Sequence, residues 1–252
     1  QGAHLASTVA DSCRGDVVMT MLADDSAVES IVFGDNGILA SLGKGAIHIS
    51  SSTISVAMSE RLTEEHAKHN QGFVAAPVFG RPEAAAAAKL FVVAAGLHPV
   101  VAVCDPLFSA IGQKTWVVGE TPKDANIIKL SGNFLIGSVI EAMGEAIALV
   151  GKAGIDRQQY LDFMTSTLFT APVYKIYGQL IVDGKFTPAA FAAPLGYKDI
   201  RLALSAAEKL RVPMPLASLL RDRFLTLFAQ GGEELDWSAI GQLAAKDSGQ
   251  AQ

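Results

Sequence analysis

The chain has 252 residues, of which 50% are hydrophobic and 18% are charged, so it can bury a sizeable core and is not disordered. Twenty Lys and Arg against 25 Asp and Glu give a net charge of −5, with no basic block that would bind nucleic acid. No uninterrupted apolar run reaches the roughly 18 residues that a membrane span needs. We therefore expect a soluble protein of one large domain or two unequal ones, with neither a nucleic-acid nor a membrane partner.

Short β-type runs alternate with helical runs in the first half of the chain, a pattern typical of parallel strands joined by crossover helices. The predicted strands cover residues 16–22, 46–50, 72–78, 90–95 and 115–118. The predicted helices cover residues 24–33, 55–70 and 100–111, the first of them capped by the Asp24-Asp25-Ser26 run. Residues 1–121 are therefore predicted to form an α/β domain.

The strand pattern ends near residue 124, and long apolar-periodic helices separated by Gly or Pro follow. The first of these helices, residues 124–152, is apolar on most sides, which is typical of a helix packed within a helical assembly. The other predicted helices cover residues 156–168, 172–182, 195–211, 215–230 and 237–246. Residues 122–252 are therefore predicted to form a second, all-helical domain.

Two cysteines are present, Cys13 and Cys104, with no CxxC pair and no histidine cluster near them. This usage favours two buried thiols in a reducing compartment over a disulfide or a metal site. The first residues also lack the basic and apolar regions of a signal peptide. We expect a cytoplasmic protein without a bound metal.

The carboxyl ends of the predicted strands are where an α/β domain of this kind binds its ligand. Here they are residues 21–22, 51–53 and 77–81, which are short and mostly uncharged. Such segments suit backbone approach to a flat cofactor, and they are equally compatible with ordinary strand-to-helix turns.

Polar residues share one face of the long predicted helix, because Asn126, Lys129 and Asn133 are spaced by three and four. A partly desolvated lysine would have its pKa lowered, and could exchange a proton with a substrate oxygen. Asn133 could orient that ammonium or bind the same oxygen. The alternative is a solvated helix face, since Glu141 and Glu145 extend the stripe.

No hydrolase, zinc-protease or phosphate-loop motif occurs. His66 and His69 are three apart on a charged helix, where a solvated face is favoured over a metal pair. Lys198 and Asp199 begin another amphipathic helix, and the simplest interpretation is a surface ion pair.

Six segments, in this order, resemble the β-hydroxyacid dehydrogenase family, the group that contains 3-hydroxyisobutyrate dehydrogenase and the glyoxylate or succinic semialdehyde reductases. The resemblance covers essentially the whole chain. The segments are DVVMTML (16–22), FGDNGIL (33–39), SSTIS (51–55), APVFG (76–80), KLSGN (129–133) and KDIRLAL (198–204).

The resemblance implies a Rossmann-like parallel-sheet domain followed by an all-helical domain like the C-terminal domain of 6-phosphogluconate dehydrogenase. It implies hydride transfer between NAD or NADP and a small β-hydroxyacid or aldehyde acid, with Lys129 as general acid/base and Asn133 as its partner. A positioned cation there would stabilise the negative charge that hydride addition leaves on a carbonyl oxygen. The residues it assigns to the cofactor are Leu22, Ala23, Thr53 and Lys198.

Two departures from the family pattern stand out. The opening strand, GxGxxG turn, helix and second strand are not found, so about 40 residues are expected to be absent and the cofactor to bind poorly. The substrate loop reads APVFGRP where family members usually have APVSGG, so that Phe79 and Arg81 replace a serine and a glycine. The resemblance assigns Phe79, Gly80 and Arg81 to the substrate. Arg81 could bind a substrate carboxylate through two hydrogen bonds or face outward, while Phe79 would narrow the pocket.

The apolar helices of the second domain predict a homodimer or a higher homo-oligomer. Two other functions remain open from the sequence. One is an imine reductase of similar fold, against which Lys129 argues, and the other is a non-catalytic dimerising remnant.

Overall fold

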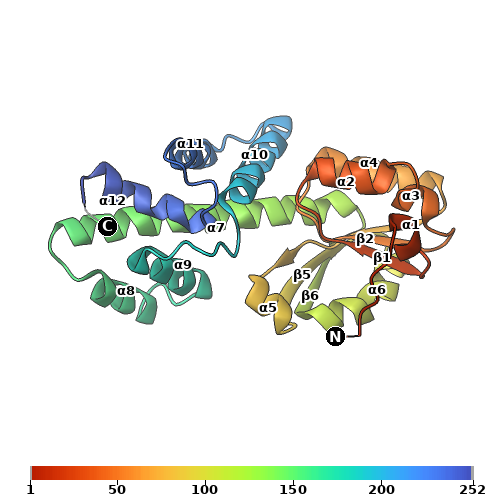
Figure 1. The fold of residues 1–252 in the computed structure, drawn as a ribbon, viewed down its shortest axis with the longest axis horizontal. Helices are drawn as coiled ribbons and strands as arrows, with labels where there is room; N and C mark the ends of the chain where they lie inside the picture. Colours follow the sequence, from red (N-terminus) through yellow and green to blue (C-terminus); the bar gives the residue numbers. More distant parts are fainter. Residues whose placement is uncertain (1, 251–252) are drawn as a thin grey trace. The chain divides into compact units, whose positions relative to one another are not determined.

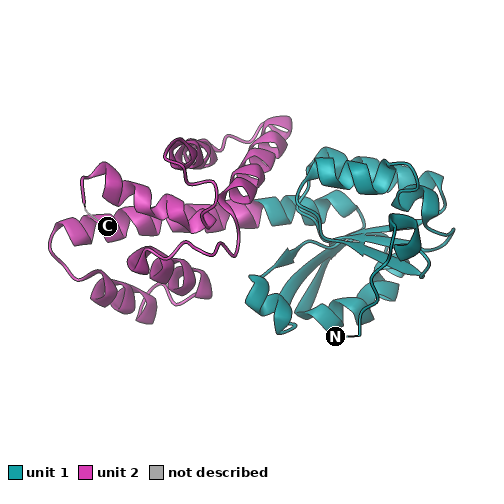
Figure 2. Ribbon diagram, in the orientation of Figure 1, with its two compact units in different colours: residues 1–130 teal, residues 131–252 magenta. Residues whose placement is uncertain are grey.

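The computed structural model describes residues 2–250 (Figure 1) and forms two compact units, Gln1–Leu130 and Ser131–Gln252 (Figure 2). Helix α7 (Pro122–Lys152) is a single helix that contributes residues to both units. The domain boundary expected between residues 121 and 122 coincides with the start of α7 and stays a prediction.

Unit 1 is built around one six-stranded sheet with the order β1-β2-β3-β5-β4, in which β6 also pairs with β5. Its strands are β1 (Val17–Thr20), β2 (Ile47–Ser50), β3 (Gly72–Ala75), β4 (Val78–Phe79), β5 (Leu90–Ala95) and β6 (Gly112–Gly119). Its helices besides the start of α7 are α1 (Val9–Ser12), α2 (Asp25–Phe33), α3 (Ile38–Ser41), α4 (Val56–Lys68), α5 (Pro82–Ala86) and α6 (His98–Ile111). The expected α/β class is confirmed.

The direction of the strands departs from the simple parallel pattern in one place. β1, β2 and β3 are parallel, as are β5 and β6, but β5 runs antiparallel to both β3 and β4. The expected strand over residues 72–78 is split at Pro77, which has no N–H to donate to a sheet. β4 and β5 then pair across the short helix α5, a connection suited to antiparallel rather than parallel neighbours.

Helices cover the sheet on two faces (Figure 1). On one face, residues of α2, α3 and α4 such as Val28 and Leu62 pack with Phe73 of β3. On the other, residues of α6 such as Phe108 pack with Ile49 of β2. Because side chains alternate along a strand, His48, next to Ile49, points to the face that α4 covers.

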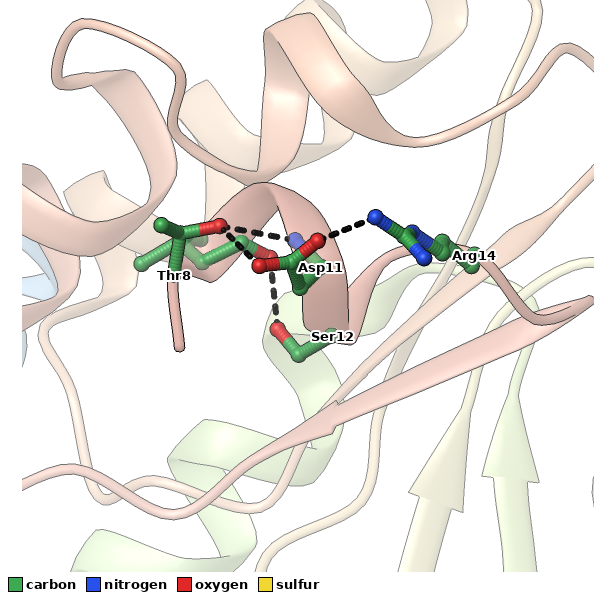
Figure 3. A network of polar contacts seen from close by, with 5 residues as sticks. Thr8, Asp11, Ser12 and Arg14 are labelled. Carbon is green, nitrogen blue, oxygen red and sulfur yellow. Dashed lines mark hydrogen bonds and ion pairs between the residues drawn. The ribbon is translucent and has the colours of Figure 1, made fainter. Parts of the chain in front are cut away.

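Local capping explains where several helices begin. The Asp24 side chain accepts a hydrogen bond from Ala27 N at 2.8 Å, which confirms the expected cap of α2. The four-residue helix α1 was not expected from the sequence, and a small polar network holds it (Figure 3). In that network Thr8 accepts from Asp11 N at 3.0 Å, and Arg14 forms an ion pair with the Asp11 carboxylate. Helix α3 was also missed, because four residues are too few for a periodic pattern.

Both cysteines are free and buried, as expected. Burial raises the pKa of the Cys104 thiol to about 11 and also raises that of Cys13. Each thiol is therefore protonated and unreactive at neutral pH.

Unit 2 is all-helical, as expected. It contains the rest of α7 with α8 (Arg157–Ser166), α9 (Pro172–Asp183), α10 (Ala193–Leu210), α11 (Pro215–Ala229), a 3-10 helix (Trp237–Gln242) and α12 (Leu243–Asp247). One hydrophobic core joins these helices, with Ile140, Ile200 and Phe224 fully buried in it. The helix expected over residues 237–246 is thus a 3-10 helix followed by a short α-helix.

Helix α7 also meets a simple test for a membrane span. An 18-residue window of α7 has a mean hydropathy of 1.7, and 39% of that window is buried. The search for uninterrupted apolar runs in the sequence did not find this window, because charged residues interrupt it. The core helix of a soluble protein passes the same test by length and composition, and α7 contributes to both compact units.

Candidate active site

In unit 1, two hydrogen bonds connect the segments at the carboxyl ends of β1 and β2. Ser51 N donates to Thr20 O at 2.8 Å, and Leu22 N donates to Ser52 Oγ at 2.7 Å. The turn at Leu22 and Ala23 therefore lies beside the loop that carries Thr53, with Ala23 exposed and the other two half-buried. Three of the four residues assigned to the cofactor thus gather at one edge of the sheet.

Lys129 lies over an aromatic ring in the same unit. Its Nζ is 4.2 Å from the centroid of the Phe79 ring, a distance at which the ring face attracts an ammonium group. The first turns of α7 are fixed there because Ala125 is fully buried in a cluster with Ala75 and Ala95, against which Phe79 packs. Phe79, assigned to the substrate from the sequence, is therefore also a direct neighbour of the lysine.

The loop after β4 is shaped by Gly80 and Arg81. Gly80 has a φ of +142°, and a Cβ there would lie 2.7 Å from Cδ2 of Leu90, so only glycine fits. Arg81 is half-buried and its Nη1 is fully buried. The alternative of a wholly outward-facing Arg81 is therefore wrong.

Asn126 is 1% exposed, and neither Nδ2 nor Oδ1 has a hydrogen-bond partner among residues 2–250. Asn133 is buried as well, and Glu141, further along α7, is 4% exposed. The alternative of a solvated helix face is therefore wrong for this part of α7. Only Glu145 at the far end of the stripe is exposed.

In unit 2, a buried carboxylate holds Asn133. Asn133 Nδ2 donates to Asp199 Oδ2 at 2.5 Å, and Lys198 Nζ lies 3.2 Å from Asp199 Oδ1. Asp199 is 1% exposed, so the interpretation of Lys198 and Asp199 as a surface pair is wrong. Since a carboxylate only accepts, Asp199 fixes which end of the Asn133 amide faces it. Asp199 was missed as a site residue because its partner is distant in the sequence.

Lys129 and Asn133 are four residues apart on the continuous helix α7, so they lie one turn from each other. Lys129 belongs to unit 1 and Asn133 to unit 2. Side chains four residues apart project from the same side of a helix.

Comparison with known proteins adds an independent observation. Residues 1–119 match the family profile for the NAD-binding domain of 6-phosphogluconate dehydrogenase, and residues 124–244 match that for the NAD-binding domain of NADP-dependent 3-hydroxyisobutyrate dehydrogenase. The chain is 42% identical over 241 residues to the uncharacterized oxidoreductase YfjR of Bacillus subtilis, covering 95% of this chain and 84% of that protein. The chain belongs to the β-hydroxyacid dehydrogenase family.

Other members agree with that assignment. Glyoxylate/succinic semialdehyde reductase 1 of Arabidopsis thaliana is 29% identical over 88% of this chain and 76% of that protein. The crystal structure of 3-hydroxyisobutyrate dehydrogenase from Salmonella typhimurium has a TM-score of 0.84 at 27% identity, covering 92% of this chain and 80% of that one. The protein is an NAD(P)-dependent oxidoreductase of the family that acts on CH–OH groups.

The first profile matches from residue 1, so it does not confirm the expected absence of an opening unit. Among residues 2–250, no group of three or more His, Cys, Asp or Glu side chains could hold a metal ion.

Proposed function

We propose that Lys129 is the general acid/base of this oxidoreductase and that Asn133 binds the same substrate oxygen. The observation that carries the proposal is their spacing of one turn on α7, with Lys129 beside Phe79 and Asn133 fixed by Asp199. In the reducing direction, the Lys129 ammonium donates its proton to the carbonyl oxygen as negative charge develops there. In the oxidising direction the neutral amine takes the hydroxyl proton.

The residues at the carboxyl ends of β1 and β2 fit a nicotinamide cofactor. Leu22, Ala23 and Thr53 are uncharged and lie at one edge, and the small side chain of Ala23 is exposed there. Lys198, which the resemblance also assigns to the cofactor, is 20% exposed and paired with Asp199. The cofactor, NAD or NADP, supplies or accepts the hydride when bound.

The substrate in this proposal is a small β-hydroxyacid or aldehyde acid. Arg81, with Nη1 buried, supplies a planar donor pair for the substrate carboxylate, since the family's serine is replaced here by Phe79. The Phe79 ring narrows the space beside Lys129 and favours a short carbon chain.

A homodimer or higher oligomer is part of the proposal. Large apolar side chains of unit 2 are exposed, among them Leu149 at 72%, Phe163 at 61% and Leu168 at 83%. Burying these side chains against a second copy of the chain would remove apolar surface from water, which favours association. Light scattering at micromolar concentration tests this, and a monomeric mass would reject it. The two free cysteines support a reducing, cytoplasmic location.

Binding of the cofactor is measured first, and turnover of candidate substrates second. A thermal shift with NADH or NADPH is expected, because a ligand of the native state raises its stability. Oxidation of the reduced cofactor with glyoxylate, succinic semialdehyde and a cyclic imine then separates aldehyde acids from imines. No shift with either cofactor, both in the given chain and in one extended at its start by a GxGxxG strand-helix-strand unit, would favour a non-catalytic protein. Turnover of the imine alone would favour an imine reductase.

A further inference from the structure

A continuous chain of four buried side chains crosses unit 1 from β1 to the loop before β3. Thr20 Oγ1 lies 2.9 Å from His48 Nε2, and His48 Nδ1 lies 2.9 Å from His66 Nε2. His66 Nδ1 lies 2.7 Å from Gln71 Oε1. Both histidines are 0% exposed, against the expectation that His66 lies on a solvated face. We call these four residues the histidine chain.

The donors and acceptors of the histidine chain follow from its end at Gln71. Gln71 Nε2 donates to the backbone carbonyls of Leu39 and Leu42 at 3.1 and 2.7 Å, so Oε1 must face His66. His66 Nδ1 therefore donates to Gln71, which leaves Nε2 of a neutral ring as an acceptor. By the same reasoning His48 Nδ1 donates to His66, and His48 Nε2 accepts from the Thr20 hydroxyl.

The surroundings keep both rings neutral. Phe73 of β3 stacks on His66 with an interplanar angle of 5°, and also contacts His48. Burial lowers the pKa of His66. Burial also lowers the pKa of His48 well below its usual value, and the neighbouring His66 imidazole lowers it further. β1, β2 and β3 contain no charged residue.

The helices packed on this face carry charged groups on α2 and α4. On α2, Asp25 accepts a hydrogen bond from Ser55 N, and Glu29 pairs with Arg61. His69 is exposed, bonds to the Glu65 carbonyl, and acts on His66 electrostatically. The α4 carboxylates point to other partners or to solvent, since Glu65 pairs with Lys68, Glu60 pairs with Lys123, and Glu64 is exposed. No carboxylate among residues 2–250 forms an ion pair with either buried ring, so a proton on the chain would be a poorly compensated buried charge.

The chain ends at the edge that carries the proposed cofactor residues. Thr20 is the last residue of β1, its carbonyl accepts from Ser51 N, and Leu22 two residues later is held by Ser52. We propose that the histidine chain positions the Thr20 end of β1 for cofactor binding, and that uptake of one proton reverses the Thr20 hydroxyl and weakens that binding. This inference rests on the proposed function.

The proton balance of the reversal follows from the geometry. A proton arriving at Thr20 Oγ1 is passed to His48 Nε2, and His48 gives its Nδ1 proton to His66 Nε2. His66 is then an imidazolium donating to Gln71 and His48, while His48 stays neutral with its proton on Nε2. The Thr20 oxygen has changed from donor to acceptor, so its own hydrogen must turn away from His48 in a site where Thr20 is only 6% exposed.

Nuclear magnetic resonance of the full chain with ¹⁵N-labelled histidine tests the bonding pattern without cofactor. At pH 7.5 both buried rings are expected as neutral tautomers with hydrogen on Nδ1. Thr20→Val, which removes the hydroxyl with little change in shape, is expected to shift the His48 Nε2 resonance, and Thr20→Ser to restore it. Hydrogen on Nε2 of either ring at pH 7.5, or an unchanged His48 signal in Thr20→Val, would overturn the proposal.

Cofactor titration between pH 5 and 8, followed by fluorescence of NADPH or NADH, tests the link to binding. The affinity of the wild type is expected to fall only on the acid side of the ordinary histidine range, because burial lowers the pKa of both rings, as the Nδ1 tautomer of His48 is lost. Thr20→Val is expected to bind about three- to tenfold more weakly at pH 7.5, the worth of one buried hydrogen bond, and Thr20→Ser like the wild type. The matched control is His98→Gln, which removes an exposed imidazole of α6 on the other face of the sheet and should leave the pH profile unchanged.

The two hypotheses fail in different ways. A wild-type chain that binds neither cofactor at any pH contradicts the proposed function, and with it the role of the histidine chain in binding. Tight binding that is equal in Thr20→Val, or that stays constant at a pH where the nuclear magnetic resonance spectrum shows the Nδ1 tautomer of His48 lost, leaves the proposed function intact and overturns the positioning role.

Discussion

Asn133 and Asp199 are 66 positions apart in the chain and are joined by a buried hydrogen bond of 2.5 Å from Nδ2 to Oδ2. The carboxylate of Asp199 also pairs with Lys198, so one buried acid links a residue assigned to the substrate oxygen with one assigned to the cofactor. In the proposed mechanism, Asp199 is therefore a positioning residue that acts through Asn133 and Lys198.

Replacing Asp199 is therefore expected to reduce turnover without abolishing it. Asp199→Ala leaves the Asn133 amide without its acceptor, and we expect a loss of stability of about 1.5–3 kcal/mol, typical of a hydrogen bond to a charged group. Asp199→Asn keeps an acceptor oxygen facing Asn133, and should retain more kcat than Asp199→Ala. Urea unfolding and steady-state kinetics of both variants measure this. Equal kcat in the two variants would remove Asp199 from the orientation of Asn133.

Lys129→Ala should lower kcat at least about a hundredfold, because general acid/base catalysis is worth that much or more. The dissociation constant of the cofactor should stay nearly the same, since the lysine is assigned to the substrate oxygen. Lys123→Ala is the matched control: it removes another lysine of α7, one that pairs with Glu60, and should leave kcat near the wild-type value. Unchanged turnover in Lys129→Ala would exclude this residue from the mechanism.

Arg81 is expected to set the affinity for the substrate carboxylate. Arg81→Met should raise KM for an aldehyde acid about ten- to hundredfold, the equivalent of one charge-assisted hydrogen bond, with little effect on cofactor affinity. Arg81→Lys keeps the charge but loses the planar donor pair, so its KM should lie between those of the wild type and Arg81→Met. Arg14→Met, a change at an exposed arginine of unit 1, serves as control. An unchanged KM in Arg81→Met would mean that another group binds the carboxylate.

The sequence predicts those structural features that depend only on residues close together in the chain. The Asp24 cap of α2 and strand β5 over residues 90–95 follow from local capping and from an apolar run, and both are found as expected. The spacing of Lys129 and Asn133 on one helix face is equally local, and needs only the helical period.

Features that depend on tertiary contacts were not predictable in this way. The burial of His66 depends on β2 presenting His48 to α4, which requires the register of β2 in the sheet. The role of Asp199 depends on α10 packing so that its carboxylate meets Asn133. The antiparallel direction of β5 depends on its pairing with β4. β4 has only two residues, which are too few to give a periodic pattern in the sequence.

Glu141 provides a test of electrostatics in unit 2. Its Oε1 is 2.7 Å from Arg223 Nε, and Arg223 also pairs with Asp247 at 2.7 Å. Burial nevertheless raises the pKa of Glu141 to about 7 from 4.5, because the desolvation of the carboxylate outweighs the attraction of the arginine, and nearby Glu145 adds repulsion. This carboxyl is therefore partly protonated near neutral pH in the folded chain.

The raised pKa of Glu141 makes the folded chain less stable as the pH rises. Between pH 4.5 and 7 the folded chain binds more protons at Glu141 than the unfolded chain does, so this site's contribution to stability is complete below pH 4.5 and is lost as the pH rises through 7. Urea unfolding at pH 5.5 and 7.5 should show that Glu141→Gln gains stability relative to the wild type as the pH rises. Comparing variant with wild type at each pH cancels the buried histidines, whose lowered pKa values act in the opposite direction. Glu145→Gln, at an exposed position one turn along α7, should show a much smaller change, and an equal change in both variants would contradict the burial of Glu141 as the cause.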